Sequence, residues 1–416
     1  MSTPQQPSTS ERRIDLDWVR IGAFGLLIFY HVGMLYVSWG FHIKSAHRLT
    51  WLEPLMLFLN PWRLSLLFLV SGVATRFMLG KYRLAAFVGA RSARLLIPLI
   101  FGMLVIVPPQ SYLQVVQKFG YAGSFADFYA THYLAFAPQF CDRGNCILMP
   151  TWNHLWFVAY LLVYTAILAL LLAMAPRLIR GIERRLTPVL SGPLLLLLPA
   201  LALVAYRIWL QPVFPQTNAL IGDWYNHALY GTMFAFGYLF ALDGGVAGAT
   251  QRLRWPALTA AIIGYGAYMA WRTLGQNGVP SAEALAVLGR SAYGVFQWSA
   301  IIAILGFGRL WLRGDTPARR YLTDAVFPYY IVHQSAIILT AYWLRAADLP
   351  AAAEAAIVIA VTLASFALTY EIVRRVHWLR PLFGLKLLSP SVASAEQRLA
   401  ARDLSGSPVT ISADNR

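Results

Sequence analysis

The sequence has 416 residues, of which 58% are hydrophobic and 12% are charged, and its formal net charge is +16 at pH 7. Soluble domains carry about 25% charged residues, so this composition excludes a protein that faces water on all sides. The apolar residues form repeated runs of roughly twenty, the length that a helix needs to cross a membrane. Because backbone polar groups in lipid must be satisfied within their own segment, we expect these runs to be helices. The sequence predicts an all-α, polytopic integral membrane helical bundle.

Ten apolar stretches predict about ten transmembrane helices. In chain order they cover residues 18–39, 60–79, 95–113, 154–175, 193–211, 224–242, 256–274, 284–307, 321–344 and 355–373. The first stretch is too long for a signal-peptide core and has no small-residue cleavage site after it, so we expect it to remain in the mature protein. The polar ends predict a disordered segment at residues 1–13, a transmembrane domain at residues 14–388 and a disordered cytoplasmic tail at residues 389–416.

Basic residues alternate between the connecting segments. The segments after every second apolar stretch are rich in arginine, whereas the others hold few basic residues: Lys44, Arg48, Lys118, Arg143, Arg272 and Arg345. By the positive-inside rule the arginine-rich set is cytoplasmic, which predicts an even number of spans with both termini inside. We therefore interpret the net charge as an orientation signal that can also bind anionic lipids. We expect no nucleic-acid partner, because no basic soluble domain is present.

The longest outward segment, residues 114–153, holds both cysteines, Cys141 and Cys146. The residues between them, Asp-Arg-Gly-Asn, favour a turn, and an outward compartment permits oxidation. A local disulfide and two unpaired cysteines both remain open. A metal site is less favoured because no further Cys or His lies at suitable spacing, and we expect no bound metal or other cofactor.

The first apolar stretch carries the strongest candidate site, formed by Asp17, Arg20 and His31. Arg20 and His31 are eleven residues apart, so a helix places them on one face about 16 Å apart. Asp17 shares this face and can pair with Arg20 three residues later. One face thus carries a charged pair at the cytoplasmic edge and a titratable imidazole near the middle of the membrane. A structural histidine that bridges two helices is the alternative interpretation of His31.

The second and third stretches contain further candidates. Arg63 lies near the outer end of its stretch, where its side chain can reach the interface. Ser71 and the following Gly72 favour close helix packing. Arg91 and Arg94 share a face at the cytoplasmic edge, where arginines suit phosphate groups but also set topology.

The ninth stretch contains Tyr330, His333 and Gln334. His333 lies about midway across the membrane, and its neighbours could satisfy it structurally, so we give it less functional weight than His31. Four more polar residues cluster toward the outer face and could line an acceptor cleft: His154, Arg207, Asp223 and His227.

Together these residues resemble the bacterial acyltransferase-3 family of membrane O-acyltransferases, over roughly residues 13–388. The matching motifs are Arg20 with His31, the stretch from Arg63 to Gly72, Arg91 with Arg94, and Tyr329-Tyr330-Ile331-Val332-His333. The residues Asn60-Pro61-Trp62-Arg63 and Leu66-Leu67-Phe68 are similar to the branch that contains glucan biosynthesis protein C. The commoner family form has a second arginine beside Arg91, where this chain has Ser92.

This resemblance implies a location in a bacterial inner membrane. It implies that cytosolic acyl-CoA is a co-substrate that donates an acetyl or succinyl group, and that the acceptor is a carbohydrate hydroxyl on the periplasmic side. It implies His31 as the catalytic histidine, Arg20 as its motif partner, and Arg91 with Arg94 as donor-binding residues. His31 would act either as a general base or as a covalent acyl relay. The competing class is a transporter or flippase for an acylated or anionic sugar, although we find no convincing internal repeat. A homo-oligomer is compatible with the sequence.

Overall fold

The computed structural model describes residues 13–142, 145–240, 244–276 and 283–387. The two segments that we expect to be disordered, residues 1–13 and 389–416, lie outside these ranges apart from Arg13.

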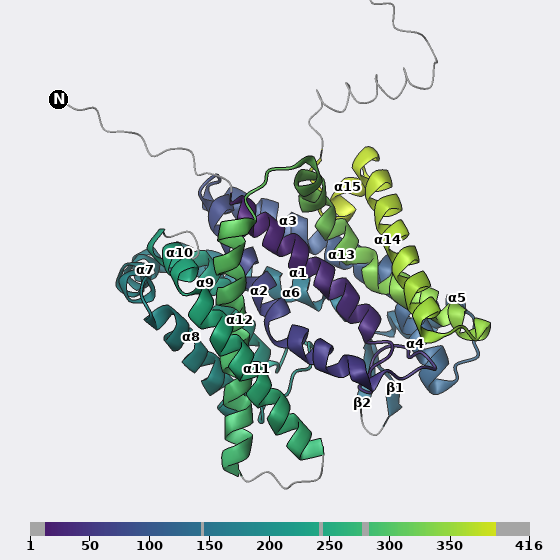
Figure 1. Cartoon of the computed structure of the whole chain (residues 1–416). Helices are drawn as coiled ribbons and strands as arrows, with labels where there is room; N and C mark the ends of the chain where they lie inside the picture. Colours follow the sequence, from purple (N-terminus) through teal and green to yellow (C-terminus); the bar gives the residue numbers. More distant parts are fainter. Residues whose placement is uncertain (1–12, 143–144, 241–243, 277–282, 388–416) are drawn as a thin grey trace, which may run out of the picture.

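The described chain is built mainly of helices, joined by short 3-10 or π-helical segments (η) and one pair of strands (Figure 1). The α-helices are α1 (Ile14–Gly33), α2 (Glu53–Leu79), α3 (Leu84–Phe101), α4 (Pro108–Phe119), α5 (Phe125–Asp127), α6 (Trp156–Met174), α7 (Pro176–Leu190), α8 (Leu194–Ala205), α9 (Trp224–Phe240), α10 (Gly244–Arg252), α11 (Arg254–Gln276), α12 (Glu283–Trp311), α13 (Pro317–Leu344), α14 (Ala351–Arg375) and α15 (Leu379–Leu382). The η segments are η1 (Thr50–Leu52), η2 (Gly102–Ile106), η3 (Phe128–His132), η4 (Tyr133–Ala135), η5 (Asn153–Leu155), η6 (Tyr206–Leu210) and η7 (Arg345–Ala347). The strands are β1 (Ala137–Asp142) and β2 (Asn145–Met149), which pair antiparallel.

Each of the ten expected spans falls on helical structure, but two of them end differently from the prediction. The first helix ends at Gly33 rather than near residue 39. There the ammonium group of Lys44 donates to the carbonyl oxygens of Met34, Val37 and Trp39, which satisfies backbone groups beyond the helix. The third span changes into the π-helical segment η2 and is interrupted at Pro108, since proline has no backbone N–H to continue the ladder.

The segment between α4 and α6 departs from a purely helical fold, because β1 and β2 form a hairpin there. Cys141 and Cys146 are joined by a disulfide across this hairpin. Of the two alternatives that the sequence leaves open for the cysteines, the structure therefore shows the local disulfide.

Six described helices are long and apolar enough to cross a membrane: those spanning Ile14–Gly33, Thr50–Leu79, Leu84–Ile106, Asn153–Met174, Glu283–Trp311 and Ala351–Arg375. The number rises to eight if two sharply bent helix pairs, α7 with α8 and α9 with α10, each count as one span. The helices α11 and α13 account for the difference from the expected ten.

Close helix contacts depend on small residues. A Cβ atom at Gly72 of α2 would lie 2.1 Å from the carbonyl oxygen of Phe234 in α9, and one at Gly237 would lie 1.9 Å from that of Leu69. Only glycine permits the two backbones to approach this closely. The close-packing interpretation of Gly72 is therefore confirmed.

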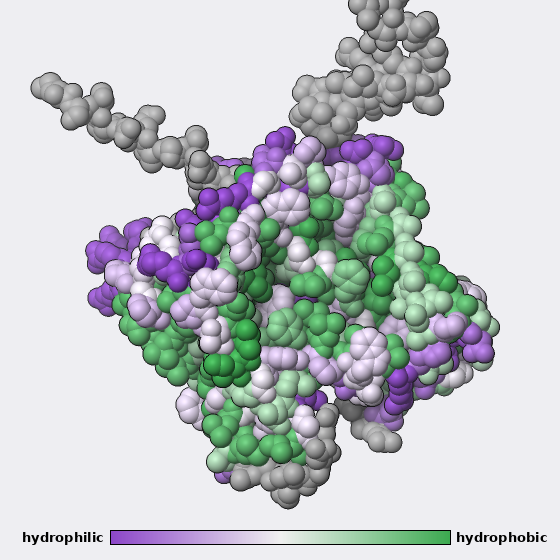
Figure 2. Space-filling view, in the orientation of Figure 1, coloured by the Kyte–Doolittle hydropathy of each residue, from purple (hydrophilic) through white to green (hydrophobic). Residues whose placement is uncertain are grey.

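The surface has an apolar band between hydrophilic ends. Figure 2 shows hydrophobic residues over the middle of the visible face and hydrophilic residues at the end where α1 begins and α15 lies. Large apolar side chains are exposed along the helices, including Leu170, Ile263 and Leu368. A membrane protein needs such an apolar band to contact lipid, whereas soluble proteins rarely expose so large an apolar surface to water.

Candidate active site

Three imidazole rings meet where α1, α13 and η5 come together. The Nδ1 atom of His31 lies 3.2 Å from Nε2 of His333. The ring centroids of His333 and His154 are 4.9 Å apart and nearly perpendicular. His333 is fully buried and His154 is 6% exposed, whereas His31 is partly exposed. His31 lies in the last turn of α1, because this helix ends at Gly33, and not near its middle as the longer expected span implies.

The neighbours of His333 and His31 determine which ring nitrogens carry protons. The Nδ1 atom of His333 lies 2.6 Å from the carbonyl oxygen of Tyr330. A carbonyl oxygen only accepts, so Nδ1 of His333 donates, and Nε2 of the neutral ring is left as an acceptor. His31 must then donate from Nδ1 to that Nε2. This leaves the Nε2 lone pair of a neutral His31 free to accept a proton or attack an electrophile.

His154 is fixed by a separate set of polar contacts. Its Nε2 atom lies 3.0 Å from the carbonyl oxygen of Ile331, and Tyr330 donates its hydroxyl to the backbone carbonyl of His154. Gln110 Oε1 accepts from the amide groups of Asn153 and Gln334. The ring of His154 is thus held in place by backbone and amide groups, as buried polar groups generally are.

On one side of the imidazoles lies a cavity of about 220 Å³ with three arginines in its wall, Arg20, Arg91 and Arg94. Ser71 and Tyr330 also line it. The Tyr330 ring lies 5.6 Å from the His333 ring, measured between centroids. The cavity therefore extends from three guanidinium groups to the edge of the histidine cluster.

On the other side lies a second cavity of about 300 Å³, and its wall includes His31, His154 and Gln334. Along α1 the residues of the first cavity, such as Arg20, precede His31, and along α13 Tyr330 precedes Gln334. Both helices thus pass from the arginine-lined cavity, through the His31–His333 pair, to the second cavity. We call the arginine-lined cavity the inner cavity and the second one the outer cavity, after the orientation that the charge pattern of the sequence predicts.

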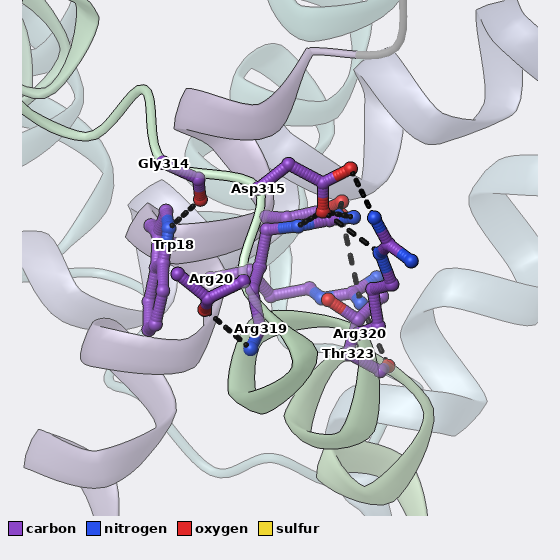
Figure 3. Close-up of polar contacts among 9 residues, drawn as sticks. Trp18, Arg20, Gly314, Asp315, Arg319, Arg320 and Thr323 are labelled. Atoms are coloured by element: carbon purple, nitrogen blue, oxygen red, sulfur yellow. Dashed lines mark hydrogen bonds and ion pairs between the residues drawn. The ribbon is translucent and has the colours of Figure 1, made fainter.

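The inner ends of α1 and α13 are joined by charged groups (Figure 3). Arg319, which is 2% exposed, forms ion pairs with Asp17 of α1 and with Asp315. Arg20 donates to the backbone carbonyl of Thr323, 2.9 Å away. The expected Asp17–Arg20 pair is present, but at 3.9 Å it is a looser contact than the Asp17–Arg319 pair. Asp17 therefore mainly connects two helices.

Arg63 does not extend to the membrane interface, because it is 2% exposed and its guanidinium carbon lies 3.8 Å above the centre of the Tyr30 ring. This contact is a cation–π interaction, which can hold an arginine inside a protein. The Nε and Nη1 atoms of Arg63 have no hydrogen-bond partner among the described residues. Arg63 lines neither the inner nor the outer cavity, so the structure does not place it in either pocket as the sequence analysis expects.

The four residues expected around an outer cleft separate into different environments. His154 lines the outer cavity. Asp223 is fully buried behind it, and His227 contacts the carbonyl oxygen of Leu220. The guanidinium carbon of Arg207 lies 4.0 Å from the centre of the Tyr293 ring, and Arg207 lines neither cavity.

Sequence patterns missed the partners that these residues have on distant segments. Arg319 lies in one of the arginine-rich segments that the charge pattern assigns to topology, and its burial against Asp17 follows only from the packing of α13 on α1. Gln110 and Asn153 belong to no recognisable motif. Even so, the amide of Gln110 contacts His154, and Asn153 donates to Gln110. Among the described residues no group of three or more His, Cys, Asp or Glu side chains is arranged to hold a metal ion.

Comparisons with known proteins agree with this architecture. Residues 13–373 match the acyltransferase-3 family model, which is described as an acyltransferase domain. The chain is also similar to glucans biosynthesis protein C from Escherichia coli K12 and from Escherichia coli O1:K1, with 26% identity over 161 residues in each case. The matched part covers 39% of this chain and 39% of each relative. No solved structure matches. Since the family model covers most of the sequence, the chain belongs to the acyltransferase-3 family.

Proposed function

We propose that this protein is a membrane O-acyltransferase that moves an acetyl or succinyl group from cytosolic acyl-CoA to a hydroxyl of a periplasmic or cell-surface carbohydrate. The observation that supports this most is the pair of cavities on either side of the His31–His333 contact. Such an arrangement lets two substrates approach one reacting group from opposite sides of a membrane. The names of the similar proteins, which refer to glucan biosynthesis, support a carbohydrate acceptor.

The inner cavity suits the donor. Acyl-CoA carries phosphate groups, and arginine binds phosphate through paired N–H donors. The side chain of Arg91 is 6% exposed, and its Nε atom has no hydrogen-bond partner in the described chain. Such a buried and incompletely paired guanidinium is costly unless a ligand completes it. We therefore assign donor binding to Arg91 and Arg94, with Arg20 completing the cationic wall.

The outer cavity suits the acceptor, and His31 supplies the chemistry. The acceptor hydroxyl oxygen attacks the thioester carbonyl carbon while its proton passes to Nε2 of His31. The carbon–sulfur bond then breaks, and the proton is returned to the leaving CoA sulfur. Acting as a covalent relay, His31 would use the same lone pair to accept the acyl group first and pass it on afterwards. In both cases the His333 contact keeps that lone pair available.

The decisive variant is His31→Ala, which removes the reacting imidazole and little packing. We expect this variant to fold and insert but to lose transfer by at least about 100-fold, the usual lower bound for removing a general base. The measurement uses purified protein, labelled acetyl-CoA or succinyl-CoA and a neutral oligosaccharide. It follows free CoA thiol and labelled ester in parallel.

The matched control is His377→Ala, since His377 is exposed and lines neither cavity. It should retain wild-type rates. If His31→Ala keeps more than about a tenth of the activity, His31 is structural and the mechanism is wrong. If the wild-type protein moves an acylated sugar between compartments without releasing CoA thiol, the protein is a transporter.

A further inference from the structure

The wall of the outer cavity is assembled from separate parts of the chain. Apart from the histidines, it includes the indole rings of Trp152 and Trp156, the amide groups of Asn153 and Asn218, and the hydroxyl of Thr217. Its volume of about 300 Å³ lies at the lower end of the range for small-molecule sites. The cavity is therefore large enough for a small ligand beside His31.

The chemistry of this wall is polar but uncharged. Among the residues that line the cavity there is no Asp, Glu, Lys or Arg. Burial lowers the pKa of His42 to about 4, partly offset by its hydrogen bond to Gln114, so this ring is neutral at physiological pH. Amide and hydroxyl groups both donate and accept hydrogen bonds, whereas indole rings offer flat apolar surfaces. This combination fits a ligand that has apolar faces and several hydroxyl groups.

The loop that contributes Thr217 and Asn218 to the cavity wall is built around one buried carboxylate. Asp223 is fully buried and accepts hydrogen bonds from the backbone N–H of Asn218 and from the hydroxyl of Tyr160, at 2.8 and 2.6 Å. The backbone carbonyl of Asn218 in turn accepts from Nε1 of Trp152. The indole and the loop are thus fixed before any ligand arrives, which reduces the entropy lost on binding.

Two residues of the cavity wall, Asn153 and Asn218, have an uncommon backbone conformation. Asn153 and Asn218 have φ values of +40° and +59°, in the region that residues other than glycine rarely adopt. Both residues line the cavity. Uncommon backbone conformations of this kind persist where the surroundings impose them, and they concentrate at ligand sites.

We infer that the outer cavity is the acceptor subsite and that it binds one neutral hexose ring, held by stacking on an indole and by hydrogen bonds to the amide and hydroxyl groups. This inference rests on the proposed function, which supplies the acyl group, but the binding can be measured separately. The uncharged wall favours a neutral sugar over an acidic one, because a carboxylate in this cavity would have no arginine or lysine in the wall to pair with. The hexose hydroxyl nearest to His31 is the acyl acceptor.

The test blocks the cavity without changing the histidines. Thr217 is exposed, and Thr217→Trp places a large side chain in the cavity mouth. The matched control is Ala219→Trp, an exposed position two residues along the same loop that does not line the cavity. Calorimetry of the purified full-length proteins uses neutral glucose and galactose trisaccharides and, for comparison, glucuronic acid oligosaccharides.

We expect the wild-type protein to bind at least one neutral trisaccharide and Thr217→Trp to bind it more than about tenfold more weakly, a difference of roughly 1.4 kcal/mol. Ala219→Trp should match the wild type, and only Thr217→Trp should raise the acceptor KM while leaving the donor KM unchanged. Equal binding by both tryptophan variants, tighter binding of the acidic sugar, or no binding of any neutral trisaccharide would overturn the inference.

The two proposals fail separately. If the wild type transfers acyl groups and Thr217→Trp leaves the acceptor KM unchanged, the cavity assignment is wrong and the proposed function stands. If the wild type binds the neutral sugar in the cavity but never releases CoA thiol, the sugar site stands and the proposed function is wrong.

Discussion

The pairing of His31 with His333 shows how a side chain acquires its role from a neighbour far along the sequence. The carbonyl oxygen of Tyr330 fixes the proton on Nδ1 of His333, and this ring then accepts from His31. A histidine whose tautomer is set in this way presents the same nitrogen to every substrate. We therefore propose that His333 positions His31, a role that its own sequence context did not indicate.

Substitutions at His333 should separate positioning from packing. His333→Ala should fold and lower kcat by less than His31→Ala does, because the base remains but its tautomer is no longer fixed. His333→Gln should recover part of the loss, since Gln Oε1 can accept from Nδ1 of His31 in place of the ring. Steady-state kinetics with acyl-CoA varied provides the measurement. An equal loss of kcat in His333→Ala and His333→Gln, or a change in KM alone, would contradict a positioning role.

Sequence patterns predict the arrangement of residues within one helix well and contacts between helices poorly. The helical period places Arg20 and His31 on one face, and both side chains do face α13. The same reasoning could not find Arg319 or Gln110, because their partners are about 300 and 220 residues away in the chain. Arg63 was misjudged for a similar reason, since the Tyr30 ring that covers it belongs to another helix.

At the scale of helices, α1 and α13 form a parallel pair with nearly constant register. The contacts Asp17–Arg319, Arg20–Thr323 and His31–His333 join residues separated by 302, 303 and 302 positions. A constant difference means that the two helices advance together from the charged end to the histidine end. The ion pair at the inner end therefore helps to align the two histidines at the outer end. Sequence reasoning could predict both helices but not this alignment.

Breaking the Asp17–Arg319 ion pair should loosen that alignment. Asp17→Asn removes the charge that faces the buried guanidinium, and breaking a buried ion pair typically destabilises a protein by about 3 kcal/mol or more. We expect a lower thermal unfolding temperature and slower transfer, measured by intrinsic fluorescence and by CoA release in nanodiscs. Arg320→Met is the control, because Arg320 pairs with Asp315 on the exposed surface and should change neither quantity. Unchanged stability in Asp17→Asn would show that Asp315 alone satisfies Arg319.

At the scale of the molecule, the directions of the helices support ten spans. The end of α12 lies at the beginning of α1, where Gly308 approaches Val19 and the carbonyl of Gly314 accepts from Trp18. If α1 runs outward, α12 must run inward. The α9–α10 pair also runs inward, so α11, which connects this pair to α12, must cross the membrane outward. The length of α11, 23 residues, corresponds to about 35 Å, enough for a membrane about 30 Å thick.

The same argument applies to α13. It runs parallel to α1 from Arg319 to His333, so it reaches the same depths as a helix that is long and apolar enough to span. Its lower hydropathy has a physical cause, since Arg319, His333 and Gln334 are buried against other helices and not exposed to lipid. Hydropathy counts such residues as polar wherever they face. Adding α11 and α13 to the eight apolar spans gives the proposed ten.

We predict that both termini are cytoplasmic and that the connecting segments alternate accordingly. Fusions of green fluorescent protein and alkaline phosphatase are made after Leu79, Pro138, Arg313 and Arg345, because the first reporter is active inside and the second outside. The fusions after Leu79 and Arg313 should be fluorescent, and those after Pro138 and Arg345 should have phosphatase activity. Both reporters are fused at every position, so each fusion is controlled by the other reporter at the same position.

The same compartment for Leu79 and Pro138 would refute the orientation set by the arginine-rich segments. The same compartment for Arg313 and Arg345 would show that α13 does not cross, and His31 and His333 would then not lie between an inner and an outer cavity.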